Sequence, residues 1–130
     1  DILRDYRDYT MICAGVFDDM VATLVLENKE AILERNRQIV EENLALMDEW
    51  IAKEPKASWI RPASVSTSFV KLDVNRPIED FALELLQDYG VLVVPGNRFD
   101  KESHVRIGYC CDKEVLQKGL EKLSQFLNKC

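Results

Sequence analysis

Two short apolar stretches joined by a turn constrain the fold of this chain more than any other feature. Residues 91–94 are four β-favouring side chains in a row, and Pro95-Gly96 ends them with a turn signal. Residues 104–108 alternate, so two apolar side chains point to one face of a strand and Arg106 points to the other. One face of this strand is therefore expected to be core, while the other carries an arginine.

Helical patterns account for most of the remaining chain. Apolar residues recur at three- and four-residue intervals over residues 18–27, 28–54, 77–89 and 112–127, which predicts four helices. Asp18 or Asp19 is expected to cap the first helix, Asn28 the second and Asp112 the last, while Pro55 stops the second and Gly90 ends the third. Residues 1 to about 17 are mixed in character and do not suggest a self-contained element.

One further strand and one loop complete the prediction. Residues 68–74 alternate as a strand with Val70 and Leu72 on one face and Phe69 and Lys71 on the other, whereas residues 55–67 read as a loop around Trp59. The expected order is helix, helix, strand, helix, strand, strand, helix. This order predicts an α+β fold: a small, mostly antiparallel sheet of about three strands covered by helices and preceded by a long helical segment.

Charge and composition exclude several classes of function. The formal net charge is −6, with 23 acidic and 17 basic residues, which argues against a nucleic-acid surface. The longest apolar run is too short to cross a membrane. The cysteines have neither zinc-site spacing nor the density of a secreted disulfide scaffold, so we expect reduced thiols and a cytoplasmic protein. They are Cys13, Cys110, Cys111 and Cys130.

Three polar residues are candidates for chemistry, and each has a plainer interpretation. The guanidinium of Arg106 suits a carboxylate or a phosphate, although most arginines are simply solvated. His104 could act as an acid or base, but no partner for a triad is evident and a structural role is favoured. Asn43 lies on the apolar side of its helix, where a buried amide bonded to backbone is favoured over a ligand-binding role.

The order of these motifs resembles the C-terminal part of class I and II aminotransferases, which are fold-type-I pyridoxal-phosphate enzymes. The resemblance rests on Tyr9-Thr10, on Val94-Pro95-Gly96 with Phe99, and on Val105-Arg106-Ile107-Gly108. It covers nearly the whole chain in element order. It implies that Arg106 binds the α-carboxylate of the substrate and that Asn97, Arg98 and Phe99 line the mouth of the same cleft.

The sequence departs from the family at two places near this cleft. The family commonly has glycines before the first small-domain strand, where this chain has Pro62-Ala63-Ser64-Val65. It also commonly has a small residue after the Pro-Gly and a glycine after the phenylalanine, where this chain has Asn97 and Asp100. We therefore expect the local loop shape and the choice of substrate to be altered at these two places.

The resemblance also implies a cofactor that this chain alone does not hold. Pyridoxal 5'-phosphate requires a Schiff-base lysine, which in the family precedes the point where this chain begins, and a phosphate cradle. Every lysine here falls on a predicted helix, beside Pro55, in a strand or in a charged loop. We therefore expect no catalytic or cofactor-binding residue and no metal site in these residues, and no turnover by this chain alone.

The resulting prediction is a part of a larger enzyme. Residues 1–27 would leave a large pyridoxal-phosphate domain and include a connecting helix, and residues 28–130 would form the small domain. The full-length parent would be a homodimeric aminotransferase acting on an amino acid and a 2-oxo acid, with its own N-terminal large domain as a partner. A lyase, decarboxylase or cyclising synthase of the same fold, a stand-alone amino-acid-binding regulatory module, and a purely structural dimerisation piece remain alternatives.

Overall fold

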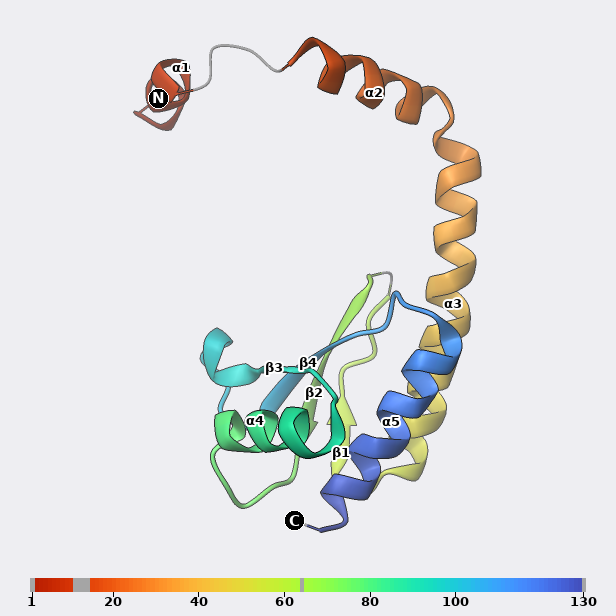
Figure 1. The fold of residues 1–130 in the computed structure, drawn as a ribbon, viewed down its shortest axis with the longest axis vertical. Helices are drawn as coiled ribbons and strands as arrows, with labels where there is room; N and C mark the ends of the chain where they lie inside the picture. Colours follow the sequence, from red (N-terminus) through yellow and green to blue (C-terminus); the bar gives the residue numbers. More distant parts are fainter. Residues whose placement is uncertain (1, 11–14, 64, 130) are drawn as a thin grey trace. The chain divides into compact units, whose positions relative to one another are not determined.

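The computed structural model describes residues 2–10, 15–63 and 65–129. The chain divides into two compact units, Asp1–Asn36 and Arg37–Cys130. Figure 1 traces both units along the chain. Helix α3 (Lys29–Lys53) begins in the first unit and ends in the second.

The first unit is helical and exposes apolar side chains. It contains α1 (Ile2–Thr10), α2 (Val16–Glu27) and the start of α3. The mixed pattern of residues 1–17 did not suggest α1. Helix α2 begins at Val16 after an extended Gly15, two residues before the expected cap, and buries none of its residues. The amide of Asn28 donates to the carbonyl oxygen of Leu24 at 2.8 Å, so its side chain serves the end of α2 rather than the start of α3.

The second unit contains an antiparallel sheet with the strand order β1-β2-β4-β3. The strands are β1 (Ala57–Trp59), β2 (Thr67–Leu72), β3 (Val94–Pro95) and β4 (His104–Gly108). The expected α+β fold is confirmed, with four strands rather than about three. The additional strand, β1, lies within the predicted loop and pairs with β2, where Trp59 is opposite Val70.

The apolar run over residues 91–94 forms less strand than expected. Only Val94 and Pro95 pair with β4, opposite Arg106 and Val105. Gly90 ends helix α4 (Ile78–Tyr89) in the left-handed conformation with φ 67°, and the backbone N–H of Val91 donates to the carbonyl oxygen of Leu85. The start of the run is therefore held to the helix rather than to the sheet.

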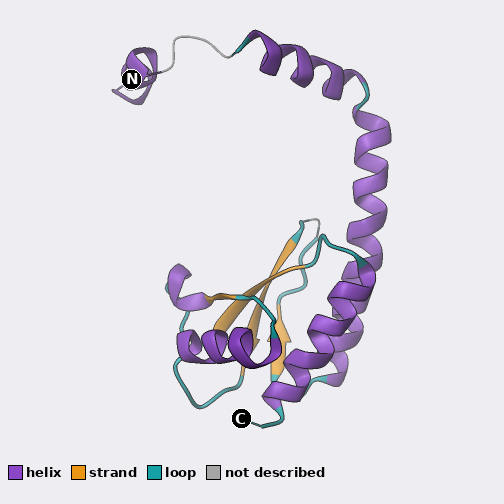
Figure 2. Ribbon diagram, in the orientation of Figure 1, coloured by secondary structure: helices purple, strands orange, loops and turns teal. Residues whose placement is uncertain are grey.

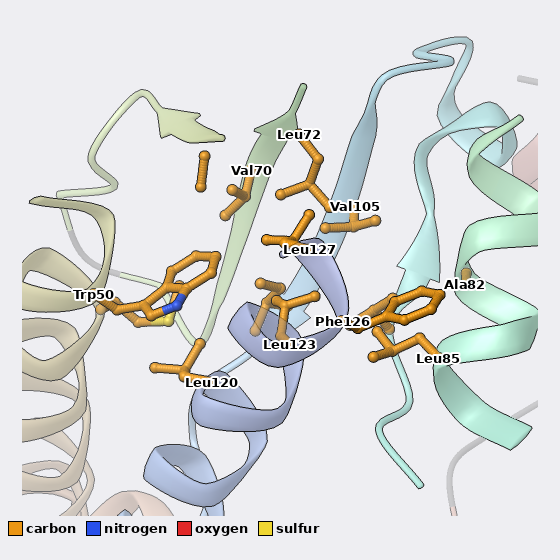
Figure 3. Close-up of a cluster of buried hydrophobic side chains, with 14 of the residues drawn as sticks. Trp50, Val70, Leu72, Ala82, Leu85, Val105, Leu120, Leu123, Phe126 and Leu127 are labelled. Atoms are coloured by element: carbon orange, nitrogen blue, oxygen red, sulfur yellow. The ribbon is translucent and has the colours of Figure 1, made fainter. Parts of the chain in front are cut away.

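Helices pack against one face of the sheet. The buried strand residues Val70, Leu72, Val105 and Ile107 meet apolar residues of α3, α4 and α5 (Lys113–Leu127) in one core. Figure 2 shows the four strands with α4 and α5 beside them, and Figure 3 shows the side chains that these elements contribute. The residues labelled in Figure 3 are Trp50, Val70, Leu72, Ala82, Leu85, Val105, Leu120, Leu123, Phe126 and Leu127.

Two expected polar contacts hold this unit together. Asn43 is buried, and its amide donates to the carbonyl oxygens of Tyr109 at 2.7 Å and Cys111 at 2.8 Å, as the interpretation of a backbone-bonded amide predicted. Asp112 caps α5 by accepting a hydrogen bond from the backbone N–H of Glu114 at 2.9 Å. The segment between the end of β4 and the start of α5 is thereby held against α3.

Candidate functional site

The face of the sheet opposite the core carries the candidate site. Because side chains alternate along a strand, the burial of Val105 and Ile107 leaves Arg106 exposed on the other face of β4. On β2, Phe69 lies directly opposite Arg106, and Lys71 lies opposite His104. Side chains from two neighbouring strands therefore share one surface around the guanidinium.

Two phenylalanines surround Arg106. Its guanidinium carbon lies 5.2 Å from the centre of the Phe99 ring, over the ring face. The Phe99 ring in turn meets Phe69 edge to face, with 5.8 Å between ring centres. An open hollow of about 270 Å³ lies beside these side chains and is lined by Thr67, Ser68, Phe69, Phe99 and Arg106.

Arg106 differs from other arginines of the second unit in its charge environment. Arg61, Arg76 and Arg98 each form an ion pair, with Asp48, Glu84 and Glu79 respectively. Within the part of the chain that the structure describes, Arg106 forms no ion pair, and its guanidinium lies over an aromatic ring. An unneutralised guanidinium beside a hollow can accept an anion without first breaking an internal pair.

The turn after β3 brings only one of its three candidate residues to Arg106. This turn is the 3-10 helix η1 (Gly96–Phe99). The Asn97 amide donates to the Glu79 carboxylate at 2.8 Å, and Arg98 forms an ion pair with the same carboxylate. Both side chains therefore tie η1 to the start of α4, whereas Phe99 reaches the hollow.

The backbone of this turn explains two features of the sequence. A Cβ atom at Gly96 would lie 2.2 Å from the carbonyl oxygen of Lys101 and 2.5 Å from that of His104, so the glycine is required by a close backbone approach. Asp100 has a left-handed backbone with φ 56°, a conformation that glycine adopts at least cost and that aspartate tolerates. The aspartate at this position therefore keeps the turn that a glycine would favour.

His104 lies beside the hollow in an apolar and cationic setting. Its ring stacks on Phe69 with 4.9 Å between ring centres, and its Nδ1 atom lies 3.4 Å from the Ser103 hydroxyl. Partial burial lowers the pKa of His104 below its ordinary value, and the nearby charges of Lys101 and Lys71 lower this pKa further. The histidine is thereby biased toward the neutral ring that stacks on Phe69.

Two cysteines follow β4 in the part of the chain that the structure describes. Cys110 and Cys111 are free thiols, and burial raises the pKa of Cys111, while Cys13 and Cys130 lie outside the described residues. No group of histidine, cysteine and carboxylate side chains in residues 2–10, 15–63 and 65–129 could hold a metal ion.

Among these same residues, no helix has the length and apolarity needed to span a membrane.

The residues present do not fit a pyridoxal-phosphate site. Lys56 is half-buried with its amino group donating to the carbonyl oxygen of Leu127 at 2.8 Å, and the other lysines of the chain are exposed. The hollow beside Arg106 contains no lysine. The glycines are scattered among separate elements and form no phosphate cradle at a helix start. Within the described residues, no lysine and phosphate cradle are arranged together to hold the cofactor.

Sequence reasoning missed the part that Phe69 plays at this surface. The alternation of residues 68–74 did place Phe69 on the face away from the core, which is an unusual position for a large apolar side chain. Its contacts are with Phe99 and His104, which lie 30 and 35 positions further along the chain. An aromatic residue on the exposed face of a strand was the available signal.

Comparison with known proteins defines the class of this chain. The model of the family described as aminotransferase class I and II matches residues 10–123. The chain therefore belongs to the class I and II aminotransferase family, a family of pyridoxal-phosphate-dependent enzymes. The predicted relationship is confirmed.

Individual relatives show how much of such a protein this chain represents. A crystal structure of a PLP-dependent aminotransferase from Streptococcus suis 89-1591 is 67% identical with a TM-score of 0.92, covering 99% of this chain and 34% of that one. Capreomycidine synthase from Streptomyces vinaceus is 29% identical over 122 residues, which are 93% of this chain and 31% of that protein. A probable N-acetyl-LL-diaminopimelate aminotransferase from Bacillus subtilis is 28% identical, covering 95% of this chain and 32% of that protein. The chain thus spans about a third of the length of these relatives.

Proposed function

We propose that this chain is the C-terminal small domain of a pyridoxal-phosphate-dependent aminotransferase that transfers an amino group between an amino acid and a 2-oxo acid. In this proposal Arg106 binds the carboxylate of the substrate. The observation that carries it is the open hollow beside a guanidinium that forms no ion pair with the described residues. The 67% identity to the Streptococcus suis enzyme supports the reaction class.

The position of Arg106 on a strand suits the binding of a carboxylate. A guanidinium presents two parallel N–H donors, which match the two oxygens of a carboxylate and fix its orientation. Because β4 is paired on both sides, by β2 and β3, its backbone cannot shift easily when the anion binds. The domain would thus orient the substrate relative to the rest of the enzyme.

The cofactor belongs to the part of the protein outside these residues. Pyridoxal phosphate stabilises negative charge at the substrate α-carbon when it is bound. We assign its Schiff-base lysine and phosphate site to an N-terminal large domain, with residues 1–27 as the connection and residues 28–130 as the small domain. We further propose that the complete protein is a homodimer. We also propose that it is cytoplasmic, because free thiols such as those of Cys110 and Cys111 are typical of a reducing compartment.

Substitution of Arg106 in the complete protein tests this function. Each of the twenty protein amino acids is added alone to the cofactor-loaded protein, and amino-group transfer is followed by the absorbance of the cofactor. We expect Arg106→Ala to lower kcat/KM for the best amino acid by about 100-fold or more, because two charge-assisted hydrogen bonds are lost. Arg61→Ala is the matched control, since Arg61 is exposed and paired with Asp48.

Two results would contradict the proposal. If no amino acid changes the absorbance of the cofactor, the proposed transfer of an amino group from a protein amino acid fails. If Arg106→Ala and Arg61→Ala lower kcat/KM equally, Arg106 has no special part in binding the substrate.

A synthase of the same fold is a second candidate, favoured by the match to capreomycidine synthase over 93% of this chain. A synthase would convert its amino acid without passing the amino group to a 2-oxo acid. Mass spectrometry of the products, with and without pyruvate or 2-oxoglutarate as acceptor, separates the two reactions. Product formation that is independent of the acceptor, with the amino group retained, would favour the synthase.

A further inference from the structure

The guanidinium of Arg106 contacts the ring of Phe99. The guanidinium carbon lies over the ring face, 5.2 Å from its centre, where the negative potential of the ring attracts a cation. A long arginine side chain on the exposed face of a strand would otherwise sample several rotamers, and ordering it costs free energy when it binds an anion. Contact with the ring reduces the number of those rotamers before binding.

Phe99 is itself held from two directions. Its turn is anchored to α4, because Asn97 and Arg98 both bind the carboxylate of Glu79. The ring packs against Phe69 in a T-shaped contact, at an interplanar angle of 84°. The ring face is therefore presented to Arg106 by a fixed turn and a fixed neighbour.

The aromatic contact continues across the sheet to β4. Phe69 lies opposite Arg106 in the strand register and stacks on His104, with an interplanar angle of 18°. His104 and Arg106 are on the same face of β4 because they are two residues apart. Three rings thus stand in series beside the guanidinium, from His104 through Phe69 to Phe99.

We propose that Phe99 is a positioning residue, which orients the guanidinium of Arg106 for a carboxylate instead of contacting the substrate itself. This inference rests on the proposed function, because it requires that Arg106 binds a carboxylate. It differs from the simpler prediction that Phe99 lines the mouth of the cleft. The two roles differ in whether an effect of Phe99 on the substrate depends on Arg106.

A double-mutant cycle in the complete, cofactor-loaded protein tests this role. The variants are Phe99→Leu, Arg106→Ala and the double variant, and kcat/KM is measured at low concentrations of the best of the twenty protein amino acids. We expect Phe99→Leu to lower kcat/KM by about two- to fivefold, which is the range for an exposed cation–π contact. We expect less than about a twofold change when Phe99→Leu is made in the Arg106→Ala background, because the contact is already absent.

Two controls separate positioning from a loss of structure. Phe99→Tyr keeps the ring face and is expected to stay within about twofold of the wild-type kcat/KM. Phe99→Leu is expected to change KM with little change in kcat and to leave the thermal unfolding midpoint within about 2 °C of the wild type, since Phe99 is 44% exposed.

Each other outcome overturns a distinct statement. If Arg106→Ala lowers kcat/KM but Phe99→Leu does not, the positioning role is wrong and the proposed function stands. If Phe99→Leu has the same effect in both backgrounds, Phe99 contacts the substrate directly. If Arg106→Ala has no effect, the proposed carboxylate site fails, and the positioning role fails with it.

Discussion

His104 lies two residues before Arg106 on β4, and its environment changes its ionisation. Partial burial, then the charges of Lys101 and Lys71, lower the pKa of its imidazole. The Nδ1 atom of His104 lies near the Ser103 hydroxyl, and the imidazole ring stacks on Phe69. The folded state thus favours neutral His104.

This preference makes the stability of the fold depend on pH. Because the pKa is lower in the folded state than the ordinary value of 6.5, the unfolded chain takes up the proton first as pH falls. The contribution of neutral His104 is complete above about pH 6.5 and is lost as pH falls through the lowered pKa. We expect the difference in the free energy of unfolding between wild type and His104→Gln to shift against the wild type between pH 7 and pH 5. Urea denaturation of both proteins across this range measures it, and a shift in favour of the wild type would contradict the assigned environment.

Asn43 connects elements that are far apart in the sequence. It lies on α3 and donates to two carbonyl oxygens in the segment that follows β4. The same segment leads through Asp112 into α5. A single buried amide therefore sets α3 against the end of the strand that carries Arg106.

Removal of this amide should destabilise the second unit strongly. Asn43→Ala leaves two carbonyl groups without a donor, and we expect the free energy of unfolding to fall by about 2–4 kcal/mol. Asn28→Ala is the matched control, because its amide also donates to a backbone carbonyl but is exposed. We expect that variant to change stability by less than about 0.5 kcal/mol. Equal losses in the two variants, measured by urea denaturation, would show that burial of the Asn43 amide is not decisive.

The two units of the molecule differ in how much they bury. All the buried apolar residues of the core lie between Leu44 and Leu127, in the second unit. In the first unit α2 buries nothing, and its exposed apolar side chains are Val16, Phe17, Met20, Val21, Leu24, Val25 and Leu26. The second unit therefore has its own core, while the first unit displays a surface that favours association.

A chain that begins at Arg37 tests this division. We expect residues 37–130 to unfold cooperatively, with a midpoint within about 3 °C of that of residues 1–130, because the core is retained. We also expect less self-association, because the exposed apolar side chains of α2 are removed. Near-ultraviolet circular dichroism and sedimentation velocity measure the two properties. Loss of the cooperative transition would show that residues 1–36 contribute to the core.

Periodicity and capping signals predicted most of the second unit. The strand expected over residues 68–74 and observed over 67–72, the helices ending at Gly90 and starting after Asp112, and the exposed side of Arg106 all follow from local spacing. Strand β1 and the shortened β3 did not, because strand pairing depends on which backbone groups meet in space. The hydrogen bond from Val91 to the end of α4 is one such encounter.

For the site, the residue types and their faces were predictable, but their pairings were not. The sequence by itself determined that Arg106 would stand on the polar face of a strand, because alternation leaves no other position opposite Val105 and Ile107. Only the tertiary structure decided that Arg98 is neutralised by Glu79 while Arg106 rests on Phe99. The physical reason is that ion pairs and ring contacts form between groups within a few ångströms in space, and local periodicity carries no information about which distant segments come that close.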